Sequence, residues 1–429
     1  MGKRQKNNYY INERLKDYPK EIADSLQYEA NSYIYHYGDH FKISKEPFYY
    51  LIIKFLFFYF KNTCFFLNNI FRKSQNLPNR PNILCNAYFD LASYIKESVN
   101  VFEVPWENNS NNFFISDLEL GSVIFKIKKK LNQKSLNKIF DPSFLILVNK
   151  YKFLFKNYLI KNNIKGIIFS IDISFFESLS ISCAKEINIP TFLFLHGLPA
   201  RYNSIDDNRT DFLIVWGNAI KNNYITKGVS RNKILVSGHP IYSKIKPQPL
   251  KSSLVNVLVL TKAMCGTPHS DMVRLMDRSN SLYYLELIMK LLKNFGVNNA
   301  RLRCHPAENP LFYKKHLPNN FYKIDTDSMQ KSIENSTLII GPSSTMILDS
   351  IKEGINYILY EPLIEGKTLT GFDFVPPFNG GSFISITSCT ESFKYNLNPE
   401  NNIKWDLIND YINNEFSLNC FYDKLFNIN

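Results

Sequence analysis

Glycine is scarce in this sequence, and it forms none of the loops that usually cradle phosphate groups. The 429 residues include 16 glycines, with neither a Gly-x-Gly-x-x-Gly nor a Walker pattern among them. The chain also lacks an Asp-x-Asp-type pair placed to hold a cation on a diphosphate. A phosphate site would therefore depend on other donors, and we expect neither a metal nor another cofactor.

Cysteine is sparse as well. Its seven residues occur without a Cys-x-x-Cys pair or any other metal-ligand spacing, and several lie in apolar runs. This pattern predicts reduced cysteines in the core of a cytosolic protein. No secretory signal peptide opens the sequence, so we expect a protein that is not secreted.

No apolar run is long enough to cross a bilayer. The most apolar stretch, 48–71, is rich in aromatic residues, but Lys54 and Lys61 interrupt it. Its uninterrupted pieces are shorter than the ~20 residues that a membrane span needs. The stretch predicts either a helix in the membrane interface or one packed on the protein or a partner. It belongs to an N-terminal helical and aromatic segment, 1–80.

Acidic residues are rare where lysines are most frequent. Residues 121–165 hold eleven lysines against one acid, Asp141, a local balance of +10 in a chain of net charge +13. Such a basic face is often only a solvated surface, but it also suits anionic lipid or an acidic polymer. Nucleic acid is not an expected partner, because no DNA- or RNA-binding motif accompanies the charge.

Short apolar strands alternate with helical stretches along most of the chain. This alternation is typical of βαβ units and a parallel sheet, and the length exceeds what one hydrophobic core usually serves. A polar, proline-containing stretch at 243–253 marks a boundary between two ordered blocks. The predicted fold class is α/β, with two Rossmann-like domains (81–245 and 254–395) facing each other across a cleft and a C-terminal helix (396–429).

Two predicted strands end in motifs suited to an anion, His305-Pro306 and Ser343-Ser344. Ligands of open α/β sheets bind at the carboxyl ends of the strands. A helix is expected to begin at Ser343 or Ser344 and to end before Gly354, so that serine hydroxyls and backbone N–H groups bind a phosphate. His305 would donate a hydrogen bond or a proton to it. The alternative is an ordinary helix cap and an ordinary proline turn.

Carboxylates at neighbouring strand ends are candidates for binding ribose hydroxyls. Asp325 and Asp327 follow the strand between the two motifs, and Glu361 follows a later strand. Helix capping is the alternative role for Asp327.

Three side chains of the first domain are candidates for a base toward an acceptor hydroxyl. His196 and Asp172 stand at strand ends. Glu177 is the third, although Ser174-x-x-Glu177 reads as a capping box, which explains the glutamate without function. His239-Pro240, next to the boundary, is interpreted as a turn.

The order of these motifs resembles a known family. His196-Gly197, His239-Pro240, His305-Pro306 and Gly341 to Thr345 resemble GT-B glycosyltransferases with cytidine-activated donors. These include the bacterial sialyl-, polysialyl- and Kdo transferases of capsule and lipopolysaccharide synthesis. The CDP-glycerol glycerophosphotransferases of teichoic acid assembly show a similar order. The likeness covers roughly 165–365.

The resemblance implies roles for individual residues. In the CMP-sialic acid enzymes the matching histidine and serines contact the donor phosphate, which assigns His305, Ser343 and Ser344 to the donor site. The flanking Pro306, Gly341 and Thr345 are assigned to the same site. The base is a carboxylate in those enzymes, matching Asp172, and the His-Gly histidine in the glycerophosphotransferases, matching His196.

The chain departs from both templates. No Asp/Glu-Asp/Glu-Gly motif of polysialyltransferases is recognisable, and Ser-Gly-His-Pro (237–240) stands where a glycerophosphotransferase has Gly-x-Pro-Arg.

The resemblance predicts a metal-independent transferase whose first domain binds the acceptor and whose second binds the nucleotide. It would move a nonulosonic-acid-type sugar (sialic, pseudaminic or legionaminic acid, or Kdo) from a CMP donor to a capsular or lipopolysaccharide glycan. The lysines and the 48–71 stretch place it in the cytoplasm, peripheral to the inner face of the membrane. The alternatives are polyol-phosphate transfer from CDP-glycerol and a non-catalytic scaffold of a polysaccharide-assembly complex.

Overall fold

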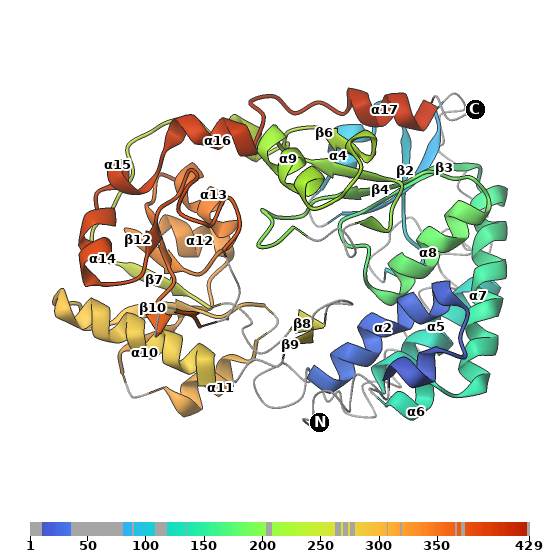
Figure 1. Ribbon diagram of the computed structural model, residues 1–429, viewed down its shortest axis with the longest axis horizontal. Helices are drawn as coiled ribbons and strands as arrows, with labels where there is room; N and C mark the ends of the chain where they lie inside the picture. The colour runs from blue at the N-terminus through green and yellow to red at the C-terminus, as the bar shows by residue number, and fades with distance from the viewer. Residues whose placement is uncertain are drawn as a thin grey trace.

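The computed structural model shows two α/β domains joined side by side (Figure 1). The apolar stretch 48–71, for which we predict an interfacial or packed helix, lies outside the residues that the structure describes. The described residues are 11–35, 80–87, 90–107, 118–133, 135–202, 208–261, 267–268, 273–274, 279–306, 308–317, 320–364, 367–369 and 374–426.

The first domain is built on a six-stranded sheet in the order β2-β1-β3-β4-β5-β6, with all neighbouring pairs parallel. The order reverses between β1 and β3, which is where ligands bind in doubly wound sheets. The strands are β1 (Asn82–Asn86), β2 (Asn100–Glu103), β3 (Ile164–Phe169), β4 (Thr191–Phe194), β5 (Phe212–Val215) and β6 (Ile234–Val236).

The second domain holds another parallel six-stranded sheet, in the order β11-β10-β7-β12-β13-β16. Counted within the domain this is the Rossmann order 3-2-1-4-5-6, and it reverses between β7 and β12. The two sheets confirm the predicted fold class, a pair of Rossmann-like domains of the GT-B type. The strands are β7 (Val257–Leu260), β10 (Ala300–Arg303), β11 (Tyr322–Ile324), β12 (Leu338–Gly341), β13 (Tyr357–Tyr360) and β16 (Ile386–Thr387).

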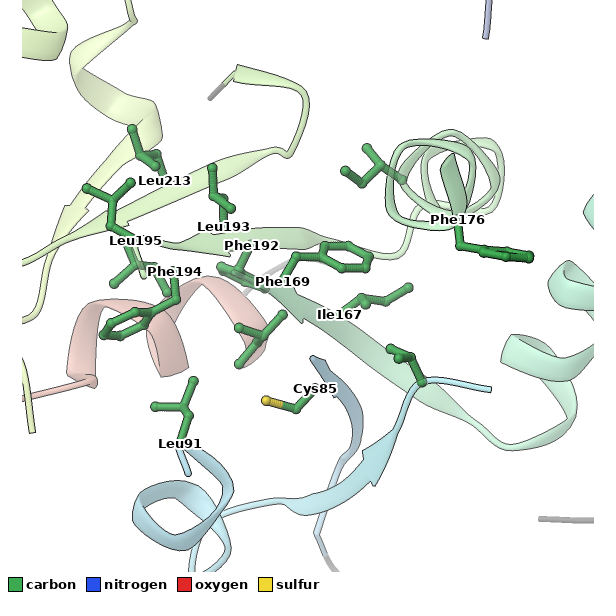
Figure 2. Packing of buried hydrophobic residues seen from close by; sticks show 14 of the residues in the cluster. Cys85, Leu91, Ile167, Phe169, Phe176, Phe192, Leu193, Phe194, Leu195 and Leu213 are labelled. Carbon is green, nitrogen blue, oxygen red and sulfur yellow. The ribbon is translucent and has the colours of Figure 1, made fainter. Parts of the chain in front are cut away.

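Strands β3 to β6 of the first sheet are apolar at nearly every position, as is typical of parallel strands with both faces covered. Figure 2 shows Phe169, Phe192 and Phe194 on the strands of this core and Phe176 on a helix beside them. That helix is α8, which contacts α2 and α7. The helices on this side are α2 (Lys20–Tyr35), α5 (Leu118–Asn132), α6 (Leu136–Ile139), α7 (Pro142–Lys161) and α8 (Phe175–Glu186).

Side chains of β7 alternate between two cores. Leu258 and Leu260 belong to the cluster that continues into the first domain, whereas Val257 and Val259 belong to a separate cluster of the second domain. The helices of this domain are α10 (Ser279–Asn294), α11 (Pro310–His316), α12 (Met329–Glu334), α13 (Met346–Lys352) and α14 (Thr390–Asn396).

The C-terminal residues return to the first domain. Where the sequence predicts one helix, the structure has α15 (Pro399–Asn402), α16 (Trp405–Tyr411) and α17 (Asn419–Phe426). Between the last two, the chain pairs with loops of the first domain, as Asn413 N–H donates to the Trp216 carbonyl at 2.9 Å. These long-range bonds break the segment into short helices.

The cysteines are only partly in the core. Cys85 and Cys183 are buried as expected, but Cys389 and Cys420 are exposed, so the cysteines are not all core residues.

Within the described residues, no helix is both long enough and apolar enough to cross a bilayer.

Candidate functional site

The serine loop connects β12 to α13 at the point where the strand order of the second sheet reverses. The helix begins at Met346, not at Ser343 or Ser344, and it ends before Gly354 as expected. Its start is delayed because Tyr357 donates to the Pro342 carbonyl at 2.7 Å and the Ser343 N–H donates to Glu361 at 3.3 Å.

A ligand at this loop would therefore be bound by serine hydroxyl groups more than by backbone N–H groups, since the N–H groups of Ser343 and Met346 are already bonded. Ser344 Oγ accepts from the Met346 N–H at 3.3 Å, but the N-cap position of α13 is Thr345, which makes no side-chain cap. The side chains of Ser343 and Ser344 are half-buried.

His305 follows β10, and its loop is tied to the end of β7. The His305 N–H donates to Thr261 Oγ1 at 2.8 Å and to Glu308 Oε2 at 3.1 Å, while the imidazole is exposed. Glu308 is fully buried and also accepts from Tyr313 at 2.7 Å and from the Thr261 hydroxyl. Three donors around one buried carboxylate hold the histidine loop in place.

The sheet order brings the two motifs to opposite sides of one strand end. β10 and β12 both pair with β7, so their loops start about 10 Å apart, twice the spacing between strands. A nucleoside phosphate lying over the end of β7 would have His305 on one side and the serines on the other.

The predicted ribose-binding carboxylates lie in three different settings. Asp325 is bonded to Arg301 at 2.8 Å and to Arg303 at 3.4 Å, with 1% of its side chain exposed, so it stabilises the end of β11. Asp327 is exposed, and it lines a polar groove of about 440 Å³ whose lining includes neither His305 nor Ser343. Glu361 is the one of the three that touches the serine loop.

His196 stands at the end of β4 with an exposed ring. Its Nδ1 lies 2.9 Å from the carbonyl of Ser170 at the end of β3. A carbonyl only accepts, so the neutral ring carries its proton on Nδ1 and Nε2 is the basic nitrogen. This geometry suits a proton acceptor at the carboxyl edge of the first sheet.

Asp172, the other predicted base, lies inside the protein. Its side chain is 1% exposed, and Oδ2 accepts from the Arg209 N–H at 3.1 Å. Asp172 therefore stabilises the loop that contains Arg209. Of the two candidates for the base, only His196 lies at the surface.

The loops of the two domains touch directly. Thr345, between the serines and α13, accepts from the Leu198 N–H at 2.8 Å. Gly197 approaches it so closely that an added Cβ would lie 2.7 Å from Thr345 Oγ1. The structure therefore brings the His-Gly and Ser-Ser-Thr motifs together, although they lie almost 150 residues apart.

His239 belongs to the joint between the domains. Its ring stacks on Tyr242 at 4.3 Å and meets Trp216 at 4.5 Å, and burial lowers its pKa to about 3. Nδ1 accepts from the Ile241 N–H, so the neutral histidine shapes a turn. Tyr242 then donates across the joint to Asp349 on α13 at 3.0 Å.

Sequence reasoning missed a buried polar cluster at the end of β1. Glu177 accepts from Asn86 and from the Trp106 indole, both at 3.0 Å. Burial raises the pKa of Glu177. Ser174 makes no side-chain cap, so the capping-box interpretation of Glu177 is wrong. Glu308 was missed too, and no local pattern distinguishes it from a surface glutamate.

Comparison with protein families and with curated proteins finds no match. Among solved structures, UDP-GlcNAc 2-epimerase from Methanocaldococcus jannaschii, with UDP-GlcNAc and UDP bound, is similar at 13% identity and a TM-score of 0.45. The similarity covers 77% of this chain and 96% of the epimerase.

Two glycosyltransferases are similar at the same level. The lipopolysaccharide outer core galactosyltransferase WaaB, in its apo form, shares 13% identity at a TM-score of 0.41, covering 81% of this chain and 98% of WaaB. A glycosyltransferase from Rickettsia africae ESF-5 shares 12% at 0.42, covering 82% and 100%. The likeness is one of fold at low identity.

Among the residues that the structure describes, no set of three or more His, Cys, Asp and Glu side chains is placed to hold a metal ion.

Proposed function

We propose that this protein is a GT-B glycosyltransferase that transfers a nonulosonic-acid-type sugar from a CMP donor to a hydroxyl of a capsular or lipopolysaccharide glycan. The observation that carries the proposal is the contact between Leu198 and Thr345. This contact joins a loop of the first domain that has an exposed histidine to a loop of the second domain that has two adjacent serines. A site divided between two domains suits a reaction with a donor and an acceptor.

The chemistry follows from the positions of the side chains. His196 Nε2 accepts the proton of the acceptor hydroxyl, whose oxygen forms a bond to the anomeric carbon of the sugar. The bond from that carbon to the donor phosphate breaks, and its electron pair leaves with CMP. The Ser343 and Ser344 hydroxyls and the His305 imidazole stabilise the charge that grows on the phosphate.

Glu361 is assigned to the ribose. A carboxylate accepts hydrogen bonds from hydroxyl groups, and Glu361 lies next to the serine loop, where its Oε1 accepts from the Ser343 N–H. Asp327, which is exposed after β11 at the same end of the second sheet, is the second candidate for the ribose. Asp325 would support that end of the sheet through its ion pairs with Arg301 and Arg303.

The proposed location is the cytoplasmic face of the membrane, where lipid-linked acceptors are presented. The support is the lysine-rich segment 121–165, which suits anionic lipid headgroups.

The first experiment is a thermal-shift titration with CMP, CDP, UMP and UDP, with and without Mg²⁺. A ligand that binds only the native state raises stability by about 2.7 kcal/mol at a hundredfold excess over its dissociation constant. We expect selective stabilisation by CMP, with the same result in EDTA. UDP is included because an epimerase of similar fold binds UDP-GlcNAc.

Each of the other outcomes indicates a different function for this protein. Preference for CDP favours polyol-phosphate transfer from a CDP-linked donor, and preference for UDP overturns the donor class. No shift with any nucleotide favours the non-catalytic scaffold. As a check on the site, Ser343→Ala with Ser344→Ala is expected to weaken CMP binding at least tenfold, and unchanged binding would refute this phosphate site.

A further inference from the structure

The outer face of α7 carries an apolar ridge, made of Ile146, Phe153 and Ile160. These side chains are 69%, 62% and 63% exposed. They recur every seven residues, so they fall within about 40° around the helix and extend over about 21 Å. The opposite face of α7 is already buried in the core through Phe144 and Tyr151. Single exposed apolar side chains are common on proteins, but an aligned set is a candidate interaction surface.

Exposed lysines lie near this ridge. Helices α5 and α7 together hold eight lysines and one carboxylate, Glu119. Lys152 and Lys156 pair with acids of neighbouring helices, Glu21 and Glu186, and Lys128 donates to the Trp106 carbonyl. The lysines of the two helices that are exposed to solvent are Lys126, Lys129, Lys150 and Lys161. The helices run antiparallel, because Lys130 donates to Ser143 at 2.6 Å and Lys150 pairs with Glu119 at 2.5 Å.

The exposed cations border the ridge. Glu119 and the exposed Lys126 are seven residues apart and so share a face of α5, the face that adjoins Lys150 and the ridge. Lys161 follows Ile160 at the end of α7 and is also exposed. Figure 1 shows α7 at the outer edge of the first domain, on the side away from the second domain.

We propose that the α7 ridge and its flanking lysines form a surface that docks on anionic phospholipid. The three apolar side chains enter the interfacial region, and the lysine stems lie along it with their ammonium groups at the headgroups. This inference rests on the peripheral location in the proposed function and names the surface that produces it. A second copy of this chain is disfavoured as the partner, because a symmetric pairing would set lysines against lysines.

Flotation of the full chain with phospholipid vesicles tests the proposal. We expect binding to vesicles of phosphatidylcholine with 30% phosphatidylglycerol, and at least tenfold weaker binding to pure phosphatidylcholine. Substituting the ridge (I146N, F153S and I160N together) is expected to lower binding to anionic vesicles at least tenfold. Lys126→Glu with Lys129→Glu should lower it as well and flatten its dependence on salt.

The matched control replaces equally exposed apolar residues of the second domain, V255S, L311S and Y395S, and should bind as the unsubstituted protein does. Equal binding of the ridge variant and this control would overturn the proposal, as would absence of binding to anionic vesicles. Two further outcomes would also overturn it. If the ridge variant melts well below the control, another part of the protein covers the ridge. If the protein forms a dimer that the ridge substitutions abolish, a second copy of the chain covers it. CMP binding by the ridge variant tests the proposed reaction separately.

Discussion

Glu29 lies on α2, and its carboxylate accepts from the Phe175 N–H at the start of α8. Burial, with the charge of Glu177 nearby, raises the pKa of Glu29 to about 7, well above its ordinary value. A carboxyl group with a raised pKa favours the folded state when it is protonated. Its contribution is therefore complete below about pH 4.5 and is lost as the pH rises through 7.

Glu29→Gln should remove this pH dependence. Glutamine stays neutral and still accepts from Phe175, so we expect similar stability at pH 5 and a gain of about 1–2 kcal/mol over the unsubstituted protein at pH 8. Thermal unfolding from pH 5 to 8 measures the difference. Glu97→Gln, at an exposed site, is the matched control, and parallel curves for both variants would contradict the assignment.

The sequence predicted that individual site residues lie at strand ends, but it did not predict their roles. Asp172 and His196 both follow strands, yet one is buried under the Arg209 loop and the other is exposed beside Ser170. Glu177 fits a capping pattern in the sequence, but its carboxylate accepts from Asn86 on β1 and from Trp106 in the turn after β2. Such roles depend on burial and on long-range partners, and neither can be inferred from the residues that are neighbours in the sequence.

Among the elements, the loop after β4 and the loop before α13 meet where the two domains join. Gly197 leaves no room for a side chain, because a Cβ there would press on Thr345. Gly197→Ala should therefore force the loops apart and cost roughly 1–3 kcal/mol, the usual range for overpacking.

A double-mutant cycle measures this contact. Thr345→Ala removes the atoms that the new methyl group meets, so Gly197→Ala should cost less in that background, with a coupling of at least 0.5 kcal/mol in urea unfolding. Gly381→Ala, where the nearest atoms lie 3.8 Å away, should have little effect. Strict additivity at Gly197 and Thr345 would contradict direct contact between the loops.

At the scale of the whole molecule, the first and last helices among the described residues, α2 and α17, both pack on the first domain. The last helix, α17, covers the first sheet, with the Phe421 ring 4.7 Å from Phe192. Ser417 N–H also donates to the Ser237 carbonyl at 2.8 Å. The first domain is therefore complete only when the C-terminal helices have crossed back from the second.

Phe421→Ala should destabilise the first domain by about 3–5 kcal/mol through the cavity that it leaves. Tryptophan fluorescence reports this domain selectively, because Trp106 and Trp216 lie in it and Trp405 lies in α16, which contacts α9 (Asn218–Thr226). Phe426→Ala, at a site 51% exposed, is the control and should cost less than 1 kcal/mol. Equal effects of the two substitutions would argue against this role of α17.

The sequence alone determined the alternation of strands and helices, because apolar runs and turn residues act locally. Asp141-Pro142, a local N-cap and N1 pair, starts α7, and Asp141 accepts from the Ser143 N–H at 2.8 Å. Helix α13 ends before Gly354 as predicted, and the φ of Gly354 is +71°. Only the tertiary structure decided that Thr345 meets Leu198 and that Glu308 anchors the His305 loop. Those contacts depend on which strand ends become neighbours, and that is set by the order of the whole sheet and by the meeting of two domains.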